Sequence, residues 1–81
     1  MKQKVLESAQ ASLNEAYRRL EREEFLGAEL GARRALWLLN RLPNEDEALA
    51  ELIQLKAEAW AILRYVLIRE FPEERKKEMN F

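Results

Sequence analysis

Apolar residues recur along the chain at the three- and four-residue steps of an α-helix, in three successive blocks. The first block follows Leu6, Ala9, Leu13, Ala16 and Leu20. The second follows Phe25, Ala28, Ala32, Ala35, Leu36, Leu39 and Leu42, and the third is apolar over about half its circumference. This pattern predicts one all-α domain over residues 1–81, an antiparallel three-helix bundle with helices at about 3–22, 25–42 and 45–70.

The boundary between the first two helices rests on the phase of the pattern. The step from Leu20 to Phe25 is five residues, which rotates the apolar stripe by about a quarter of a turn. We place a tight turn within residues 22–25, although the segment EREEF lacks the usual turn residues. One continuous helix through residue 42 is the alternative.

The second boundary has a clearer chemical signature, in the segment LPNEDE. Asn44 suits an N-cap, and Glu47 three residues later completes a capping box, so we expect the third helix to begin at about residue 45. Pro72 disfavours helical geometry at Phe71 and can itself open a new helix. We therefore expect a short C-terminal helical extension at 72–80.

The only two glycines, Gly27 and Gly31, lie four residues apart inside the second predicted helix. Each costs a helix interior about 1 kcal/mol relative to alanine, so their presence needs a reason. The first interpretation is relief of crowding where the first or third helix crosses the second. The alternatives are that Gly27 belongs to the turn, or that the pair forms a close contact with a second copy of the chain.

The opposite face of the second helix carries large apolar residues and arginines. Leu26, Leu30 and Trp37 cluster there, flanked by Arg33 and Arg41. Either the helix is covered on both sides by its neighbours, or these residues are an exposed patch, or they are scattered surface positions. Tryptophan and arginine are enriched at interface hot spots, so we predict that these five residues contact a partner protein.

The third helix also has more apolar surface than a single core requires, which suggests a second buried face shared with another copy or another protein. Lys56 lies within that apolar face. We expect its aliphatic stem to pack while its ammonium group reaches solvent or a glutamate.

Composition narrows the function by what it lacks. Cysteine and histidine are absent, which removes disulfides and ordinary zinc sites, and Ser8 and Ser12 are the only hydroxyls besides the tyrosines. We therefore expect no enzymatic activity, no cofactor and no metal. The formal net charge is −1, and glutamates are interleaved with the arginines, which argues against a nucleic-acid partner. No uncharged run is long enough for a membrane span, so we expect a soluble, cytoplasmic protein.

Two resemblances add to this interpretation. The segment EFLGAELGARRAL, with Phe25, Ala28, Ala35 and Leu36, resembles the second helix of a tetratricopeptide repeat. The whole chain resembles computationally designed helical miniproteins of the protein-binding type, in its size, its Glu/Leu/Ala/Arg composition and its capped LPNEDEALAEL segment. That resemblance implies a module that presents an apolar and arginine-rich helix face to a target protein.

The sequence thus predicts a non-enzymatic helical protein-binding module whose partner is another protein. The first alternative is a homo-oligomer, in which a second copy covers the same face. The second alternative is a small phage or thermophile regulatory protein that binds a protein or a nucleic acid. We expect no membrane partner and no small-molecule substrate.

Overall fold

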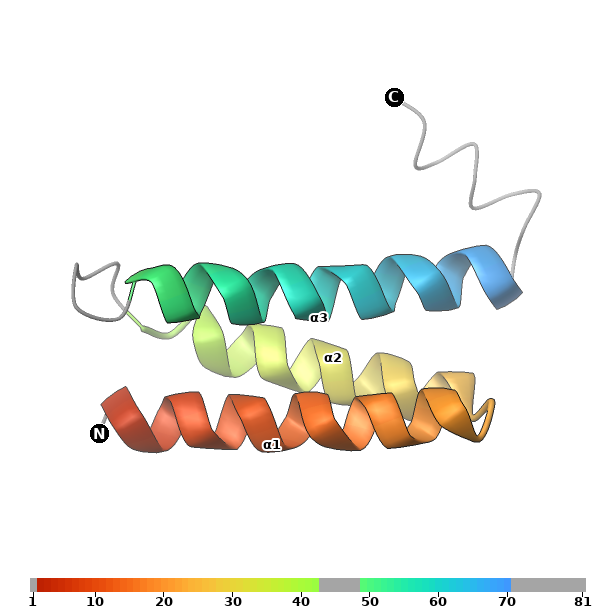
Figure 1. The fold of residues 1–81 in the computed structure, drawn as a ribbon, viewed down its shortest axis with the longest axis horizontal. Coiled ribbons are helices and arrows are strands. Elements are labelled where there is room, and N and C mark those ends of the chain that lie inside the picture. The colour runs from red at the N-terminus through yellow and green to blue at the C-terminus, as the bar shows by residue number, and fades with distance from the viewer. Residues whose placement is uncertain (1, 43–48, 71–81) are drawn as a thin grey trace, which may run out of the picture.

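A computed structural model of the chain describes residues 2–42 and 49–70, which form three helices. They are α1 (Lys2–Glu21), α2 (Phe25–Leu39) and α3 (Leu49–Glu70). Consecutive helices run in opposite directions (Figure 1), and no strand occurs in these two stretches. The predicted all-α bundle is confirmed.

The turn between α1 and α2 is present where the phase of the apolar pattern placed it, and the continuous helix is wrong. The Glu24 amide donates to the Arg19 carbonyl at 2.8 Å, and the Glu23 amide donates to the Leu20 carbonyl at 3.0 Å. These two bonds form a Schellman motif, which satisfies carbonyls at the end of a helix. The motif needs a left-handed residue, and Glu23 supplies it with φ 60°.

An ion pair closes this turn where an apolar contact often does. Arg19 Nη1 lies 2.7 Å from a carboxylate oxygen of Glu24, and Arg19 Nε lies 3.0 Å from one of Glu15. The hydrogen bonds to Glu24 and then Glu15 raise the pKa of the Arg19 guanidinium. Charged groups on both sides of the turn therefore hold a conformation that the turn residues themselves do not favour.

The second helix ends at Leu39, three residues earlier than the predicted end at 42. The Arg41 amide donates to the Leu38 carbonyl at 3.2 Å, and the Leu42 amide donates to the Leu39 carbonyl at 3.1 Å. These bonds span three residues instead of four, so the chain tightens and leaves the helix. Pro43 follows directly in the sequence, and a proline disfavours helical geometry at the residue before it.

Three predictions lie outside the described residues: the capping box of Asn44 and Glu47, the first turn of the third helix at 45–48, and the C-terminal extension at 72–80. Within the described part, α3 continues to Glu70 as one helix, as the periodicity predicts.

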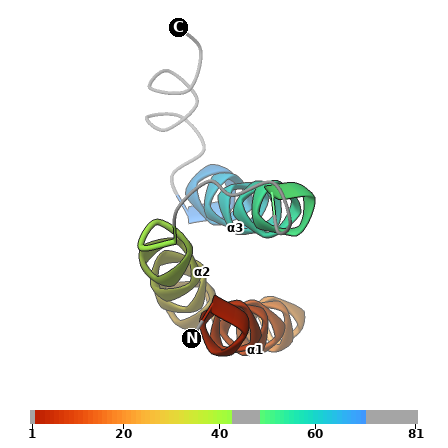
Figure 2. The ribbon, with the colours of Figure 1, turned by 90° about the vertical axis from the view of Figure 1, so that its left-hand side faces the viewer.

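The core lies along the apolar stripes predicted for the three helices. Seen end-on, α2 lies between α1 and α3 (Figure 2), and α1 and α3 make the smallest of the three helix contacts. The buried side chains are Leu6, Ala9, Leu13, Ala16, Ala28, Ala32, Ala35, Leu36, Leu39, Leu52, Leu55, Ala59, Ile62, Leu63 and Val66. At its margin Leu20, Phe25, Leu38 and Leu42 are partly buried. Three of the five buried side chains of α2 are alanines, which occupy little space between the helices.

Gly31 marks a close approach of α2 to a neighbouring helix. A Cβ at this position would lie 3.0 Å from the Ala16 Cβ and 3.1 Å from the Ser12 carbonyl oxygen, both on α1. The crowding that we inferred from the sequence is therefore real at Gly31, and the crossing helix is α1. At Gly27 a Cβ would instead meet the flexible side chain of Arg19, at 3.1 Å.

Candidate protein-binding surface

The five residues predicted to contact a partner all lie on the solvent side of α2. Leu26 is 65 % exposed, Leu30 is 59 % exposed and Trp37 is 58 % exposed. Arg33 and Arg41 are exposed as well. Although α2 packs against both neighbouring helices, neither neighbour covers these side chains, so the interpretation in which they are buried from both sides is wrong.

Two local contacts hold the arginines of this surface. Arg33 Nε donates to a carboxylate oxygen of Glu29, one helical turn earlier, at 3.0 Å. The Arg41 guanidinium lies 4.7 Å from the centroid of the Trp37 ring, in cation–π geometry. Trp37 is thus oriented by Arg41 on one side, while its own ring remains open to solvent.

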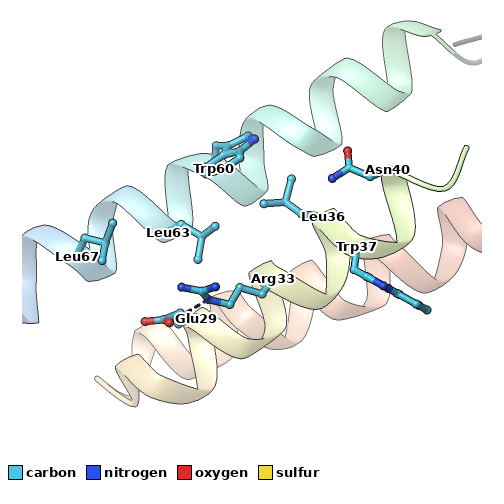
Figure 3. A pocket seen from close by; sticks show the side chains of 8 residues that line it. All are labelled: Glu29, Arg33, Leu36, Trp37, Asn40, Trp60, Leu63 and Leu67. Atoms are coloured by element: carbon cyan, nitrogen blue, oxygen red, sulfur yellow. Dashed lines mark hydrogen bonds and ion pairs between the residues drawn. The ribbon is translucent and has the colours of Figure 1, made fainter. Parts of the chain in front are cut away.

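A groove of about 450 Å³ runs between α2 and α3 beside these residues (Figure 3). It is lined by Glu29, Arg33, Leu36, Trp37, Asn40, Trp60, Leu63 and Leu67. Leu36 and Leu63 point into the space between the two helices, whereas the Trp37 ring is turned away from α3. The groove therefore has an aliphatic floor and an aromatic edge on each helix.

The predicted set overlaps this groove only in part. Arg33 and Trp37 line it, whereas Leu26, Leu30 and Arg41 lie outside its lining. Since Leu26 and Leu30 share the exposed side of α2 with Trp37, they extend the apolar surface beyond the groove.

The contribution of α3 to this surface was not among the predicted site residues. Trp60 is 56 % exposed, and Ile53, two turns earlier on the same side of α3, is 58 % exposed. In the sequence both residues belong to the broad apolar face of the third helix. Nothing in the sequence distinguishes the buried positions of that face from the exposed positions at its edge. Lys56 lies between Ile53 and Trp60 and is half-buried, which fits an aliphatic stem packed along the helix.

A polar contact joins α1 to α3 away from the groove. The Tyr17 hydroxyl donates to a carboxylate oxygen of Glu58 at 2.8 Å. Desolvation is the largest of three causes that together raise the pKa of Tyr17 to about 12. The other two are the hydrogen bond to Glu58 and the negative charge of Glu58. This bond bridges the weakest of the helix contacts.

Other kinds of site were sought in the same residues. Across 2–42 and 49–70, no three acidic side chains come together in a way that could hold a metal ion. None of the helices in this part of the chain has the length and apolar character needed to cross a membrane.

Residues 2–42 and 49–70 together form a three-helix, all-α fold with a groove between α2 and α3 that Trp37 and Trp60 border. No protein-family model, curated protein or solved structure shows significant similarity to the chain.

Proposed function

We propose that this chain is a non-enzymatic helical protein-binding module whose α2–α3 face contacts a target protein. The observation that carries the proposal is the concentration of exposed large apolar residues on two neighbouring helices: Leu26, Leu30, Trp37, Ile53 and Trp60. Single exposed hydrophobic residues are ordinary, but two tryptophans that border one groove, with further exposed apolar residues on the same two helices, are typical of an interaction surface.

The chemistry of the surface supports a protein target. Tryptophan and arginine dominate interface hot spots because they bury a large area and still offer polar groups. Here Trp37 and Trp60 border the groove, and Arg33 and Arg41 flank Trp37. The compositional resemblance to designed target-binding miniproteins favours the same function, and a small phage or thermophile regulatory protein would use the face in the same way.

A comparison of immobilised variants tests the proposal. The wild-type chain and the Trp37→Ala/Trp60→Ala double variant serve as matched baits, and Tyr65→Ala is the control because Tyr65 is an exposed aromatic residue outside the groove lining. We expect a directly binding protein to lose about 30-fold or more in affinity for the double variant, measured by calorimetry, because hot-spot truncation costs about 2 kcal/mol or more. Equal affinity for all three baits would contradict the proposal.

Self-association is the second candidate, since a second copy of the chain could cover the same apolar residues. Sedimentation equilibrium over a hundredfold range of concentration distinguishes the two. A dimer that disappears in the Trp37→Ala/Trp60→Ala variant would make self-assembly the leading function. A single monomeric species would leave the face available for another protein.

A further inference from the structure

Each of the two tryptophans stands between two cations, one four residues before it and one four residues after it. The two sets are Arg33–Trp37–Arg41 on α2 and Lys56–Trp60–Arg64 on α3. Residues four apart share one side of a helix, so the four cations lie along the same two stripes as the tryptophans that border the groove.

Among residues 2–42 and 49–70, negative charge is sparse on this side of the molecule. Among the eight residues that line the groove Glu29 alone is acidic, and Arg33 already neutralises it at 3.0 Å. Glu58 of α3 lies on the opposite side, where it accepts a hydrogen bond from Tyr17 of α1. The described part of this face therefore carries more positive than negative charge, although the formal net charge of the chain is −1.

We propose that the groove binds an acidic amphipathic helix of another protein, with apolar side chains over Leu36 and Leu63 and carboxylates facing Arg41, Lys56 and Arg64. This inference rests on the proposed protein-binding function and specifies its partner. Binding of an amphipathic helix in an apolar groove between two helices is a recurrent mode of recognition. From Glu29 to Asn40 the lining of α2 extends about 16 Å, which accommodates about three turns of a helix.

The charges and the apolar floor of the groove also argue against three other ligands: a second copy of the chain, a nucleic acid and a lipid headgroup. A symmetric dimer places the same patch of both copies together, so the four cations of one copy would face those of the other. A nucleic acid or a lipid headgroup would satisfy the cations, but the groove floor of Leu36, Leu63 and Leu67 calls for apolar side chains. An acidic amphipathic helix satisfies both requirements at once.

The protein carries its own probe for this test, because Trp37 and Trp60 are its only tryptophans and both border the groove. Three capped synthetic peptides of equal length serve as ligands. All place leucines at three- and four-residue steps, and the flanking positions hold glutamate in the first, glutamine in the second and lysine in the third. Binding is followed by the change in intrinsic tryptophan fluorescence.

We expect the glutamate peptide to bind about tenfold more tightly than the glutamine peptide, since each of three exposed ion pairs contributes at most a few-fold. The Arg41→Glu/Arg64→Glu variant should reverse the order and prefer the lysine peptide. Arg18→Glu is the matched control, because Arg18 is an exposed arginine on α1, which contributes no residue to the groove. This control should retain the preference of the wild-type chain.

Failure of the acidic-helix inference can be distinguished from failure of the proposed protein-binding function. Equal affinity for the glutamate and glutamine peptides would overturn the acidic partner and leave the protein-binding function intact. A fluorescence change with anionic phospholipid vesicles or with single-stranded oligothymidine, but with none of the peptides, would overturn both. Loss of the preference in Arg18→Glu would show that the effect comes from overall charge, which also overturns the inference.

Discussion

The two interfaces of α2 are built from side chains of different size. Toward α1, Gly31 allows the two backbones to come so close that a single added Cβ would lie 3.0 Å from Ala16. Toward α3, Leu36 and Leu63 point at one another and a groove of about 450 Å³ remains beside them. The contact of α2 with α1 is also the more extensive of the two. Small residues close one side of the helix, and large residues leave the other side open.

This difference indicates how one helix can serve both stability and recognition. Alanine and glycine allow close packing but offer little area to a partner, whereas leucine and tryptophan create walls and edges. Gly31 of α2 thus serves the closed interface with α1, and the exposed large residues of α2 remain available for contact. The following predictions test that division, from the largest expected effect to the smallest.

The sharpest test uses two adjacent residues of α2. Leu36 is 8 % exposed and belongs to the core, whereas Trp37 is 58 % exposed. We expect Leu36→Ala to lower the free energy of unfolding by about 3 kcal/mol and Trp37→Ala to change it by less than about 0.5 kcal/mol. Urea denaturation followed by circular dichroism measures both. A similar loss in the two variants would show that Trp37 is part of the core.

At the closed interface, Gly31→Leu should lower the free energy of unfolding by about 2 kcal/mol, because the new side chain meets Ala16 and the Ser12 carbonyl. Gly27→Leu is the matched control, since its neighbour is the movable side chain of Arg19. We expect the control to stay within about 1 kcal/mol of the wild-type chain, helped by the better helix propensity of leucine. If the two variants have the same free energy of unfolding, α1 and α2 are not in close contact at Gly31.

The turn that closes this interface offers a gain in stability. Glu23 has φ 60°, a conformation that glycine adopts without strain. Glu23→Gly should therefore raise the free energy of unfolding by about 1 kcal/mol. Glu21→Gly, at the last residue of α1, should lower it by up to about 1 kcal/mol, because glycine weakens a helix. Thermal unfolding of both variants tests this, and equal effects would exclude the left-handed turn.

The smallest effect concerns the contact of α1 with α3. The pKa of Tyr17 is raised to about 12 in the folded protein, so its contribution to stability is complete below about pH 10 and is lost as the pH rises toward 12. Over that interval the Tyr65→Phe variant, which keeps Tyr17, should lose stability more steeply than Tyr17→Phe. Absorbance of tyrosinate in Tyr65→Phe reports the titration directly, and a midpoint near 10 would contradict the hydrogen bond to Glu58.

Much of the fold could be predicted because helix periodicity encodes it directly. The five-residue step from Leu20 to Phe25 located a turn that no turn residue announced. The conformation of Glu23 could not be predicted in the same way, since it accompanies the ion pair of Arg19 with Glu24, which forms only once the chain has turned. The early end of α2 at Leu39 likewise reflects backbone hydrogen bonds that span three residues instead of four ahead of Pro43.

The contact residues were predicted for α2, whereas for α3 the sequence predicted a second apolar face without assigning residues of it to the site. Leu26, Leu30 and Trp37 stand opposite an obvious core stripe, which grouped them as one patch, but only the structure shows that the neighbouring helices leave this patch exposed. Trp60 lies beside the core stripe of α3, and only the position of α2 decides whether such an edge residue is covered. Both tryptophans have a cation four residues before and four residues after them. This shared spacing is a signal in the sequence that could have assigned Trp60 to the same surface as Trp37.

The short turn between α1 and α2 also has a consequence for the order in which the molecule opens. These two helices form a hairpin of low contact order, whereas α3 begins ten positions after the end of α2. We expect amide hydrogens of α3 to exchange through a partial opening in which the hairpin persists. The groove exists only while α3 is docked, so a bound ligand should slow exchange in α3 more than in α1. Ligand binding to the groove would then be detected as slower amide exchange in α3, although α3 supplies fewer than half of the residues that line the groove.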